Sequence, residues 1–255
     1  LSAFNPVQVM KGTFARNGRG SALRNGLVVF QFMISIILIT GTVVITRQMQ
    51  YMRDKTLGFD KDHIIVVERI FALPLNEIQT FLDEVKRLPG VENAAGSFSV
   101  PGGNRVGDFF GEQWRLGGSD EVLTTKSMVM DDDFASVVGF EFLEGKAFSK
   151  ASHDSLSVIL NETAVKTFDL KDPVGSKLTL AGNPERVLTV VGVVKDFNFE
   201  SLHSPITPLT IRSTESFQGG AAYAFARIHG KNIQAALGGI EDLWSTMAPG
   251  QPFKY

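Results

Sequence analysis

The first residues whose spacing suggests chemistry form a glycine-bounded loop. Residues 139–146 read Gly-Phe-Glu-Phe-Leu-Glu-Gly-Lys, which resembles a phosphate-binding loop. A loop of that kind needs four residues between its glycines and a Ser or Thr after the lysine to hold magnesium. Five residues separate Gly139 from Gly145 here, and Ala147 follows Lys146. The pattern therefore argues against nucleotide binding and favours a turn between two strands.

Three consecutive carboxylates, Asp131–Asp133, are the next candidate, for a cation site. Oxygen-ligand loops alternate their ligands and need a glycine for the sharp turn. Carboxylates at the start of a helix are stabilised by its dipole, so this run is interpreted as a helix start, with cation binding as the alternative. The four histidines are scattered, without the paired spacing of a zinc site; they are His63, His153, His203 and His229.

No nucleophile motif is present either. The chain has no cysteine, and no serine stands in a Gly-x-Ser-x-Gly sequence. We therefore predict no catalytic, cofactor-binding or metal-binding residues, no cofactor and no enzymatic activity in this chain. Phe109 with Phe110, and Phe197 with Phe199, are candidates for an apolar groove that would take a hydrophobic ligand. Core packing is the more common role of such rings, and it is the prediction for these four.

The longest apolar stretch sets the location of the chain. Residues 27–46, LVVFQFMISIILITGTVVIT, carry no charge, and as a helix they would extend about 30 Å, the thickness of a bilayer's hydrocarbon core. A core helix of a soluble protein would show a polar stripe. A cleaved signal peptide would have a shorter apolar region that ends in small residues. The stretch therefore predicts a transmembrane helix.

The charges on either side of this stretch predict its orientation. The segment before it contains four basic residues and no acidic one, whereas mixed charges follow it. Residues 48–255 carry 20 basic and 27 acidic side chains. The positive-inside rule places the N-terminal side in the cytoplasm and the long acidic part outside, in the periplasm of a Gram-negative cell. A net charge of -2 gives no indication of nucleic-acid binding.

Good helix formers continue past the apolar stretch. We expect a helix from about residue 23 to residue 57, with Gly58 as its C-cap. At about 50 Å, this helix would project some two turns beyond the bilayer. Such a projection acts either as a rigid stalk that carries motion or as a plain tether, and both interpretations stay open. Because the chain begins with Leu1, it is expected to be a fragment or a processed product.

Residues 58–255 predict an α+β (mixed α/β) extracytoplasmic domain with two lobes. A strand at 63–67 precedes a helix that Asn76 and Gln79 would start with a capping box, and residues 91–100 return as a strand. Asn161 is predicted to cap another helix. Further strands are predicted at 110–116, 121–130, 157–160, 177–180, 187–194 and 223–228, and a last helix is expected after Asn232.

Three stretches give the chain a family resemblance. They are FNPVQVMKG with the membrane segment (4–12 and 24–67), VGFEFLEGKAFSKASHDSLSVILNETAVKTFDLKDPVGSKL (138–178) and LTVVGVVKDFNFESLHSPITPL (188–209). In order and spacing these resemble the FtsX-like/MacB-type permeases of ABC transporters, especially the duplicated form of Bacteroidota. The ending GQPFKY resembles the approach to a further transmembrane helix. Residues 70–125 are the least characteristic.

The resemblance implies both an organisation and a function. It implies a cytoplasmic basic segment (1–24), a transmembrane helix with a periplasmic stalk extension (25–57) and a MacB-like periplasmic core domain (58–255) in the inner membrane. It implies coupling of ATP hydrolysis by a cytoplasmic ABC ATPase subunit to extracytoplasmic conformational change, for export or mechanotransmission. The other implied partners are the lipid bilayer, a second permease half or homodimer partner, and a periplasmic or outer-membrane component.

A second function class remains open at the level of sequence. One membrane helix with an extracytoplasmic domain also fits a single-pass sensor or ligand-binding module. That hypothesis requires a saturable ligand, and a thermal-shift screen of residues 59–255 would separate the two. An anchored periplasmic enzyme is the weakest hypothesis, because no catalytic set emerges from the residues.

Overall fold

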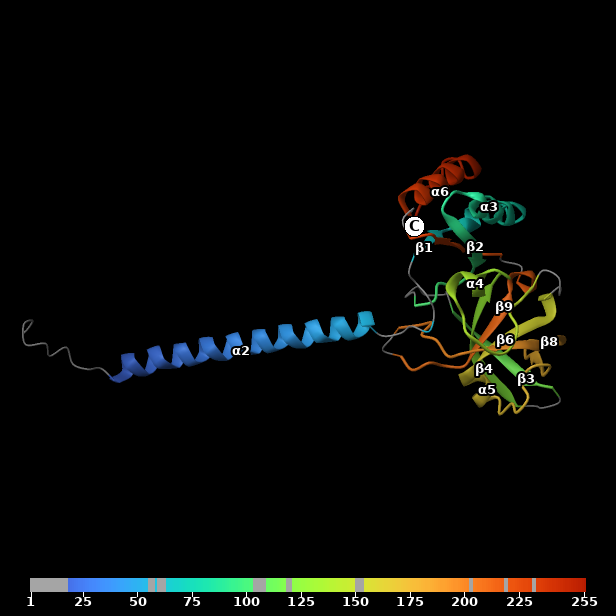
Figure 1. Cartoon of the computed structure of the whole chain (residues 1–255). Helices are drawn as coiled ribbons and strands as arrows, with labels where there is room; N and C mark the ends of the chain where they lie inside the picture. Colours follow the sequence, from blue (N-terminus) through green and yellow to red (C-terminus); the bar gives the residue numbers. More distant parts are fainter. Residues whose placement is uncertain are drawn as a thin grey trace, which may run out of the picture. The chain divides into compact units, whose positions relative to one another are not determined.

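The computed structural model describes two compact units, Leu1–Lys55 and Thr56–Tyr255 (Figure 1). The described residues are 18–54, 58, 63–102, 109–117, 121–149, 154–201, 204–217, 220–230 and 233–255.

The part of the first unit that the structure describes forms one helix, α2 (Gly18–Asp54), whose 37 residues correspond to about 55 Å. An 18-residue window within Ala22–Tyr51 has a mean hydropathy of 2.5, and none of that window is buried by the protein. The polar side chains Ser35, Thr42 and Thr46 donate hydrogen bonds to carbonyls four residues earlier, so they add no unpaired donor to the apolar surface. The prediction of one long helix able to cross a bilayer is confirmed. Its expected end at 55–57 lies outside the described residues.

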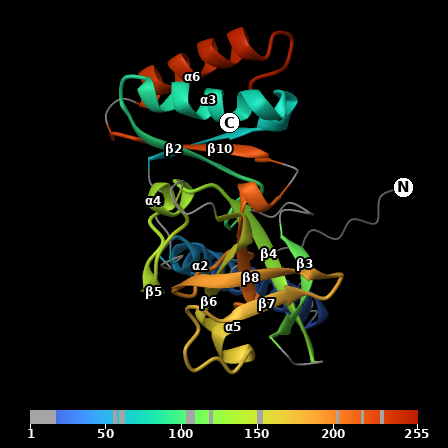
Figure 2. The ribbon, with the colours of Figure 1, turned by 90° about the vertical axis from the view of Figure 1, so that its right-hand side faces the viewer.

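The first lobe of the second unit is a three-stranded sheet covered on one face by two helices. The strands are β1 (Ile64–Glu68), β2 (Val91–Ser97) and β10 (Tyr223–Ile228), and β10 lies antiparallel between the other two. The helices α3 (Leu75–Arg87) and α6 (Ile233–Met247) lie side by side over that face (Figure 2). A short 3-10 turn, η1 (Ile70–Ala72), joins β1 to α3.

Helix α3 packs as its apolar spacing predicts but begins differently. Phe81, Leu82 and Val85 are buried on its inner face. The predicted capping box is wrong, because the helix begins at Leu75 with Pro74 as N-cap and no side-chain cap. The Pro74 carbonyl accepts the N–H of Glu77 at 2.8 Å, and a proline needs no donor partner at a helix start.

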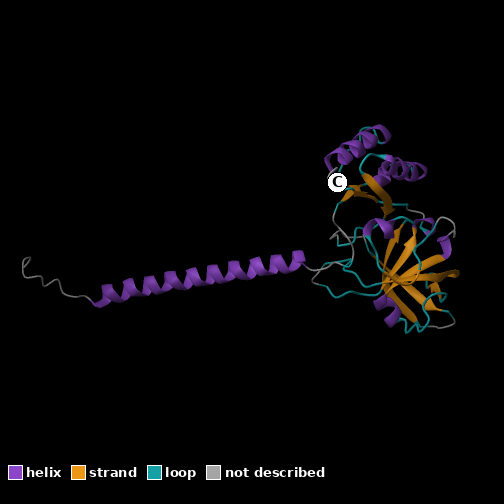
Figure 3. Cartoon of the chain, viewed as in Figure 1, coloured by secondary structure: helices purple, strands orange, loops and turns teal. Residues whose placement is uncertain are grey.

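The second lobe is a closed barrel of six strands (Figure 3). Around the ring the order is β4-β3-β7-β8-β6-β9, and the parallel pairing of β4 with β9 closes it. Closure leaves no free edge within the ring. The strands are β3 (Phe110–Leu116), β4 (Val122–Met130), β6 (Ser157–Asn161), β7 (Lys177–Leu180), β8 (Asn183–Val194) and β9 (Leu209–Ser213). Strand β9 was missed by the sequence prediction.

Short elements complete the barrel. Strand β5 (Phe142–Gly145) pairs with β8 outside the ring. The helices are α4 (Phe134–Val138) and α5 (Glu162–Thr167), with 3-10 turns η3 (Asp154–Leu156) and η4 (Thr214–Ser216). The barrel is thus inserted between β2 and β10 of the first lobe, and the predicted two-lobed α+β fold is confirmed.

Three buried clusters hold the second unit together. One lies under α3 and α6 and includes Phe81 and Trp244, whose rings meet edge to face at 5.8 Å. One fills the barrel around Trp114. The third joins the two lobes, since it combines Phe134 of α4 with Phe225 of β10. This shared core makes the lobes one folded body.

A polar contact also joins the two lobes. Lys86 on α3 donates a hydrogen bond to Asp133 at 2.6 Å. Burial alone would lower the pKa of Lys86, but the hydrogen bond to Asp133 and the nearby carboxylates raise it. Asp131 accepts the backbone N–H of Gly96 at 2.5 Å and of Phe134 at 2.9 Å. Burial raises the pKa of Asp131 to about 7, against the lowering effect of these donors.

The raised pKa of Asp131 predicts a pH dependence of stability. Between the unfolded value of 3.8 and the folded value of about 7, the folded protein binds one more proton than the unfolded chain. Stability therefore falls as pH rises through this window, by at most about 1.4 kcal/mol per pH unit, and is constant above it. We expect Asp131→Asn to remove this slope. Urea unfolding of residues 56–255 at pH 5 and pH 8 measures how the free energy of unfolding changes with pH. An equal change in the unsubstituted protein and in Asp131→Asn would contradict the assignment of the pH dependence to Asp131.

Candidate functional site

Six residues after β8, Lys195–Glu200 (the junction segment), form an irregular stretch tied down at both ends. At its start, the Lys195 backbone N–H donates to the Glu141 carbonyl, and its ammonium donates to the Glu141 carboxylate, both at 2.9 Å. This hydrogen bond and the charge of Glu141 raise the pKa of Lys195. At its end, Glu200 pairs with Lys126 at 3.2 Å. The segment is therefore fixed at its start to the residue before β5 and at its end to β4 of the barrel.

The aromatic rings of the junction segment point into the shared core. Phe197 and Phe199 are 1% and 2% exposed. The Phe197 ring lies 4.5 Å from that of Phe140, and the Phe199 ring lies 5.0 Å from that of Phe109. The prediction of core packing is confirmed for Phe197 and Phe199. Phe109 is half-buried against the same core, and Phe110 is half-buried and stacks on the Phe217 ring.

The middle of the junction segment is bonded to the start of α5. The Asp196 carboxylate accepts the backbone N–H of Thr163 at 3.0 Å and its hydroxyl at 2.7 Å. In return, the Asp196 N–H donates to the Glu162 carboxylate at 3.0 Å. A carboxylate at a helix N-terminus is favoured by the helix dipole, so the reciprocal bonds fix α5 and the junction segment to each other.

Asn161 is the buried centre of the same region. Its side-chain oxygen accepts the N–H of Ala164 at 2.9 Å, which confirms the predicted cap of α5. The same oxygen accepts the N–H of Leu209 at 2.8 Å, and its amide nitrogen donates to the Thr207 carbonyl at 3.1 Å. The side chain is fully buried. It therefore joins β6, α5 and the start of β9 in one set of bonds.

Gly58 makes a close backbone contact with the junction segment. It has φ +85°, and a Cβ atom built on it would lie 2.8 Å from the Cβ of Phe197 and 2.9 Å from its Cα. No larger residue fits this position without displacing the Phe197 backbone. The chain therefore enters the second unit directly against the junction segment. Residues 55–57 and 59–62 lie outside the described part of the chain.

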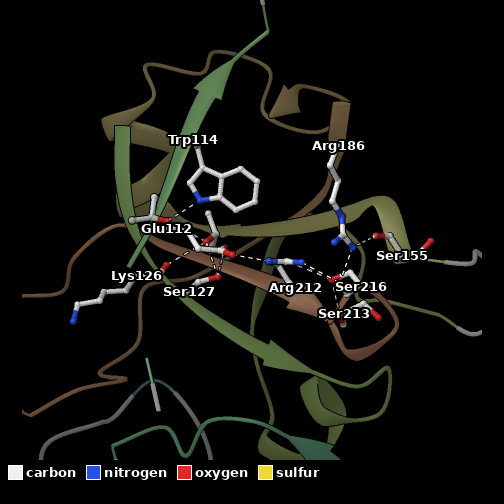
Figure 4. A network of polar contacts seen from close by, with 11 residues as sticks. Glu112, Trp114, Lys126, Ser127, Ser155, Arg186, Arg212, Ser213 and Ser216 are labelled. Atoms are coloured by element: carbon white, nitrogen blue, oxygen red, sulfur yellow. Dashed lines mark hydrogen bonds and ion pairs between the residues drawn. The ribbon is translucent and has the colours of Figure 1, made fainter. Parts of the chain in front are cut away.

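A buried polar network crosses the barrel (Figure 4). Arg212 of β9 pairs with Glu112 of β3 at 2.5 Å, and the other Glu112 oxygen accepts the Ser127 hydroxyl at 2.6 Å. Arg212 also donates to the Ser216 carbonyl at 3.0 Å, and Arg186 donates to the same carbonyl at 2.6 Å. Burial, followed by the charge of Arg212, lowers the pKa of Arg186, while Glu112 raises it.

The rest of this network is neutral. Trp114 donates its indole N–H to the Thr125 hydroxyl at 3.0 Å, and that hydroxyl lies 3.0 Å from the Thr210 hydroxyl. These groups bond to one another across β3, β4 and β9. The arrangement satisfies its own donors and acceptors, as buried polar groups require, so its role is to hold the barrel strands together.

The motifs that suggested chemistry occupy structural positions. Asp131 accepts the N–H groups of Asp133 and Phe134 at the start of α4, which confirms the helix-start interpretation. Within the described residues, no group of three His, Cys, Asp or Glu side chains is placed to hold a metal ion. His63 and His229 flank the paired ends of β1 and β10. His153 and His203 lie outside the described residues.

The interpretation of residues 139–146 as a turn between strands is wrong. Gly139 ends α4 in a left-handed conformation, and Phe142–Gly145 forms β5. The physical reason is that the apolar rings of this stretch pack inward, with Phe140 9% exposed, while its backbone pairs with β8.

These features define a class of protein before any comparison: a long apolar helix followed by a two-lobed α+β domain, with a barrel inserted into a split β-α-β sheet. A family model described as the MacB-like periplasmic core domain matches residues 26–241. The chain belongs to this family. The resemblance given by its sequence motifs is confirmed, and the chain contains a MacB-like periplasmic domain of ABC-type transporter permeases.

Two solved structures share the fold. The periplasmic region of MacB from Actinobacillus actinomycetemcomitans is similar with a TM-score of 0.56 and 13% identity, over 77% of this chain and 89% of that one. The extracellular domain of the ABC-type transporter YknZ from Gram-positive bacteria is similar with a TM-score of 0.51 and 13% identity, over 72% of this chain and 93% of that one. No curated protein sequence matches the chain. The apolar helix and the family together indicate a membrane-anchored, extracytoplasmic domain.

Proposed function

We propose that this chain is part of a permease subunit of an ABC transporter. In this proposal its periplasmic domain couples ATP hydrolysis by a cytoplasmic partner subunit to an extracytoplasmic conformational change, in export or mechanotransmission. The observation that carries the proposal is the continuity of α2, which runs without a break from the apolar span through Arg47 to Asp54. Eight residues correspond to about 12 Å of helix. The hydrogen-bonded backbone of such an extension favours a rigid stalk.

The junction segment supports this role at the domain side. Gly58 contacts Phe197, and Asp196 is bonded to α5. A displacement applied at Gly58 would therefore reach both the shared core and the barrel through packed atoms. Packed interiors transmit such strain because they have few voids to absorb it. Hydrolysis is assigned to the partner subunit, and this chain has no catalytic role.

The proposal assigns a topology: residues 1–24 in the cytoplasm, 25–57 as span and stalk, and 58–255 in the periplasm, in the bacterial inner membrane. A single introduced cysteine would be a unique label, because the chain has none. We expect the exposed position Asn183→Cys to react with a membrane-impermeant maleimide in intact spheroplasts. Asn5→Cys should react only after the membrane is permeabilised. The opposite labelling pattern would reject the topology.

The partner subunit gives the direct test of the function. We expect the full-length protein, purified through an affinity tag in mild detergent, to retain an ATPase with vanadate-sensitive activity. A purification from cells with the tag on an unrelated membrane protein is the control. Absence of ATP hydrolysis above that control, in a sample that contains intact permease, would count against the proposal. A second permease half or homodimer partner and a periplasmic or outer-membrane component belong to the same proposed assembly.

A further inference from the structure

The pairing of β3 with β7 leaves a gap in the wall of the barrel. On the β3 side it covers only Trp114 to Leu116. One further bond follows, in which the Gln113 carbonyl accepts the Ala181 N–H at 2.8 Å. Within the described residues, the first part of β3, from Phe110 to Glu112, is therefore paired with β4 but with no strand on its other side.

The backbone groups of Gly111 point into this gap. Gly111 lies opposite Lys126 of β4, and the Lys126 N–H donates to the Pro208 carbonyl at 2.8 Å, on the side of β9. Opposite residues of an antiparallel pair alternate between bonded and non-bonded pairs. Gly111 and Lys126 are therefore a non-bonded pair, and the N–H and C=O of Gly111 point away from β4. Neither group bonds to another described residue, so both are open to pairing with an extended chain.

An open hollow of about 540 Å³ lies beside the gap, within the range of about 300–1,000 Å³ that is usual for ligand sites. Its lining comes from β3, from β4 and from the turn between β7 and β8, and consists of Gly111, Glu112, Gln113, Thr124, Leu180, Gly182 and Asn183. The only carboxylate in this lining, that of Glu112, is already bonded to Arg212 and Ser127 (Figure 4). The described lining therefore offers hydrogen-bonding groups but no unpaired charge.

Two glycines in the hollow are not required by the fold. A Cβ atom added at Gly111 or Gly182 would meet nothing within 4 Å, and neither residue has a positive φ. At Gly145, by contrast, a Cβ atom would clash with the Val191 backbone. Glycine weakens a strand and often marks the close approach of a ligand or of another backbone. Gly111 lies within β3, so its missing side chain keeps the hollow clear at a cost to the strand.

We propose that this hollow binds an extended peptide segment of another protein, which pairs its backbone with the N–H and C=O of Gly111. A strand added in this way gains affinity from main-chain hydrogen bonds and specificity from pockets for alternate side chains. The side chains of Gln113, Thr124 and Asn183 around it are neutral and polar. The hollow therefore recognises mainly the backbone and accepts uncharged segments of varied sequence. This binding needs no ATP hydrolysis, so it and the proposed function can fail separately.

Hydrogen exchange of the Gly111 amide tests the pairing in the full-length protein in mild detergent. The probe is the neutral peptide acetyl-Thr-Val-Thr-Val-Thr-amide, whose residues favour an extended backbone. We expect the Gly111 amide to exchange rapidly in the free protein and at least about tenfold more slowly with the probe at millimolar concentration. The same peptide with every amide nitrogen methylated cannot donate to the Gly111 carbonyl and should give no protection. The Thr125 amide, which pairs with Glu112 inside the ladder, should stay slow throughout and reports that the barrel is folded.

Two substitutions sharpen this test. Gly111→Val places its Cβ in open space, so we expect the protein to fold and to bind the probe at least about tenfold more weakly. The control is Gly117→Ala beyond the other end of β3, where the nearest atom to an added Cβ is the Lys177 carbonyl oxygen at 3.5 Å. It should leave the protection unchanged.

Four results would overturn the proposal. Slow exchange of Gly111 in the free protein would mean that another part of the same chain covers the gap. Protection that grows with protein concentration would indicate a second copy instead of a different protein. Exchange that stays rapid at millimolar probe would show that no peptide pairs there. Equal protection by the methylated peptide would show that binding does not use the backbone.

Discussion

Glu112→Ala is expected to lower the free energy of unfolding of residues 56–255 by about 3–5 kcal/mol, because it leaves a buried charge without its partner. The side chains of Arg212 and Glu112 are 7% and 10% exposed and lie 2.5 Å apart. The guanidinium would keep its bonds to Ser216 but lose the carboxylate that neutralises it. The Ser127 hydroxyl would lose its acceptor as well. Denaturant unfolding followed by fluorescence of the buried Trp114 and Trp244 measures the change.

A double-mutant cycle separates the interaction from the packing. Arg212→Met alone should also destabilise the domain, because it leaves the Glu112 carboxylate buried and unpaired. The double variant Glu112→Ala with Arg212→Met should cost less than the sum of the two single variants, since removing both members of a buried pair leaves no uncompensated charge. The matched control is Glu141→Ala, which breaks the pair with Lys195. Their side chains are 61% and 53% exposed, so we expect a much smaller loss of stability there, because solvent screens exposed pairs. Equal costs at the two pairs would contradict the structural role of the barrel network.

Local patterns in the sequence predicted the elements that depend on local physics. The apolar spacing of α3 placed Phe81, Leu82 and Val85 on its buried face. Asn161 was predicted as a cap, because a short acceptor before an apolar run satisfies free N–H groups at a helix start. The span of α2 followed from length and charge alone. In each case the residues that form the sequence pattern lie within a few positions of the element that the pattern predicts.

Elements defined by distant pairing could not be predicted in this way. Strand β9 reads Leu-Thr-Ile-Arg-Ser, and all five residues are buried. Arg212 and the neighbouring Pro208 are residues that the sequence patterns of strands do not favour, so this segment was not predicted as a strand. It is a strand because β4 and β6 flank it and its arginine meets Glu112, 100 positions away in the chain. No local sequence pattern predicts a partner so distant in the chain. The closure of the barrel could not be predicted for the same reason, because it depends on the pairing of β4 with β9.

The candidate site was predictable only in part. The sequence motif that contains the junction segment carried the family resemblance, and its phenylalanines were predicted as core. Gly58 was predicted as a helix cap from its residue type, since glycine readily adopts positive φ. Its contact with Phe197 depends on tertiary structure that places position 58 beside the end of β8. The bonds between Asp196 and Thr163 are non-local in the same sense.

Gln50→Pro is expected to abolish coupling between the ATPase and the periplasmic domain while leaving the protein inserted in the membrane. Gln50 lies in α2 after the uncharged stretch. In an α-helix the N–H of residue 50 donates to the carbonyl of residue 46, and proline removes this bond and clashes with that carbonyl, at a cost of about 3 kcal/mol or more. The helix would kink between span and domain. The apolar stretch would stay intact, so insertion should not change.

The measurement needs a signal that comes from the periplasmic domain and changes with ATP turnover. A spin label on Asn183→Cys in the reconstituted full-length transporter reports movement when ATP and vanadate are added. We expect the unsubstituted stalk and the control Gln50→Ala to show the same change, because alanine keeps the helix. In Gln50→Pro the change should fall about tenfold or more, as expected when a kink breaks the rigid connection, while basal ATP hydrolysis persists. An undiminished response in the proline variant would make the extension of α2 a plain tether, and coupling would then have to pass through other membrane helices.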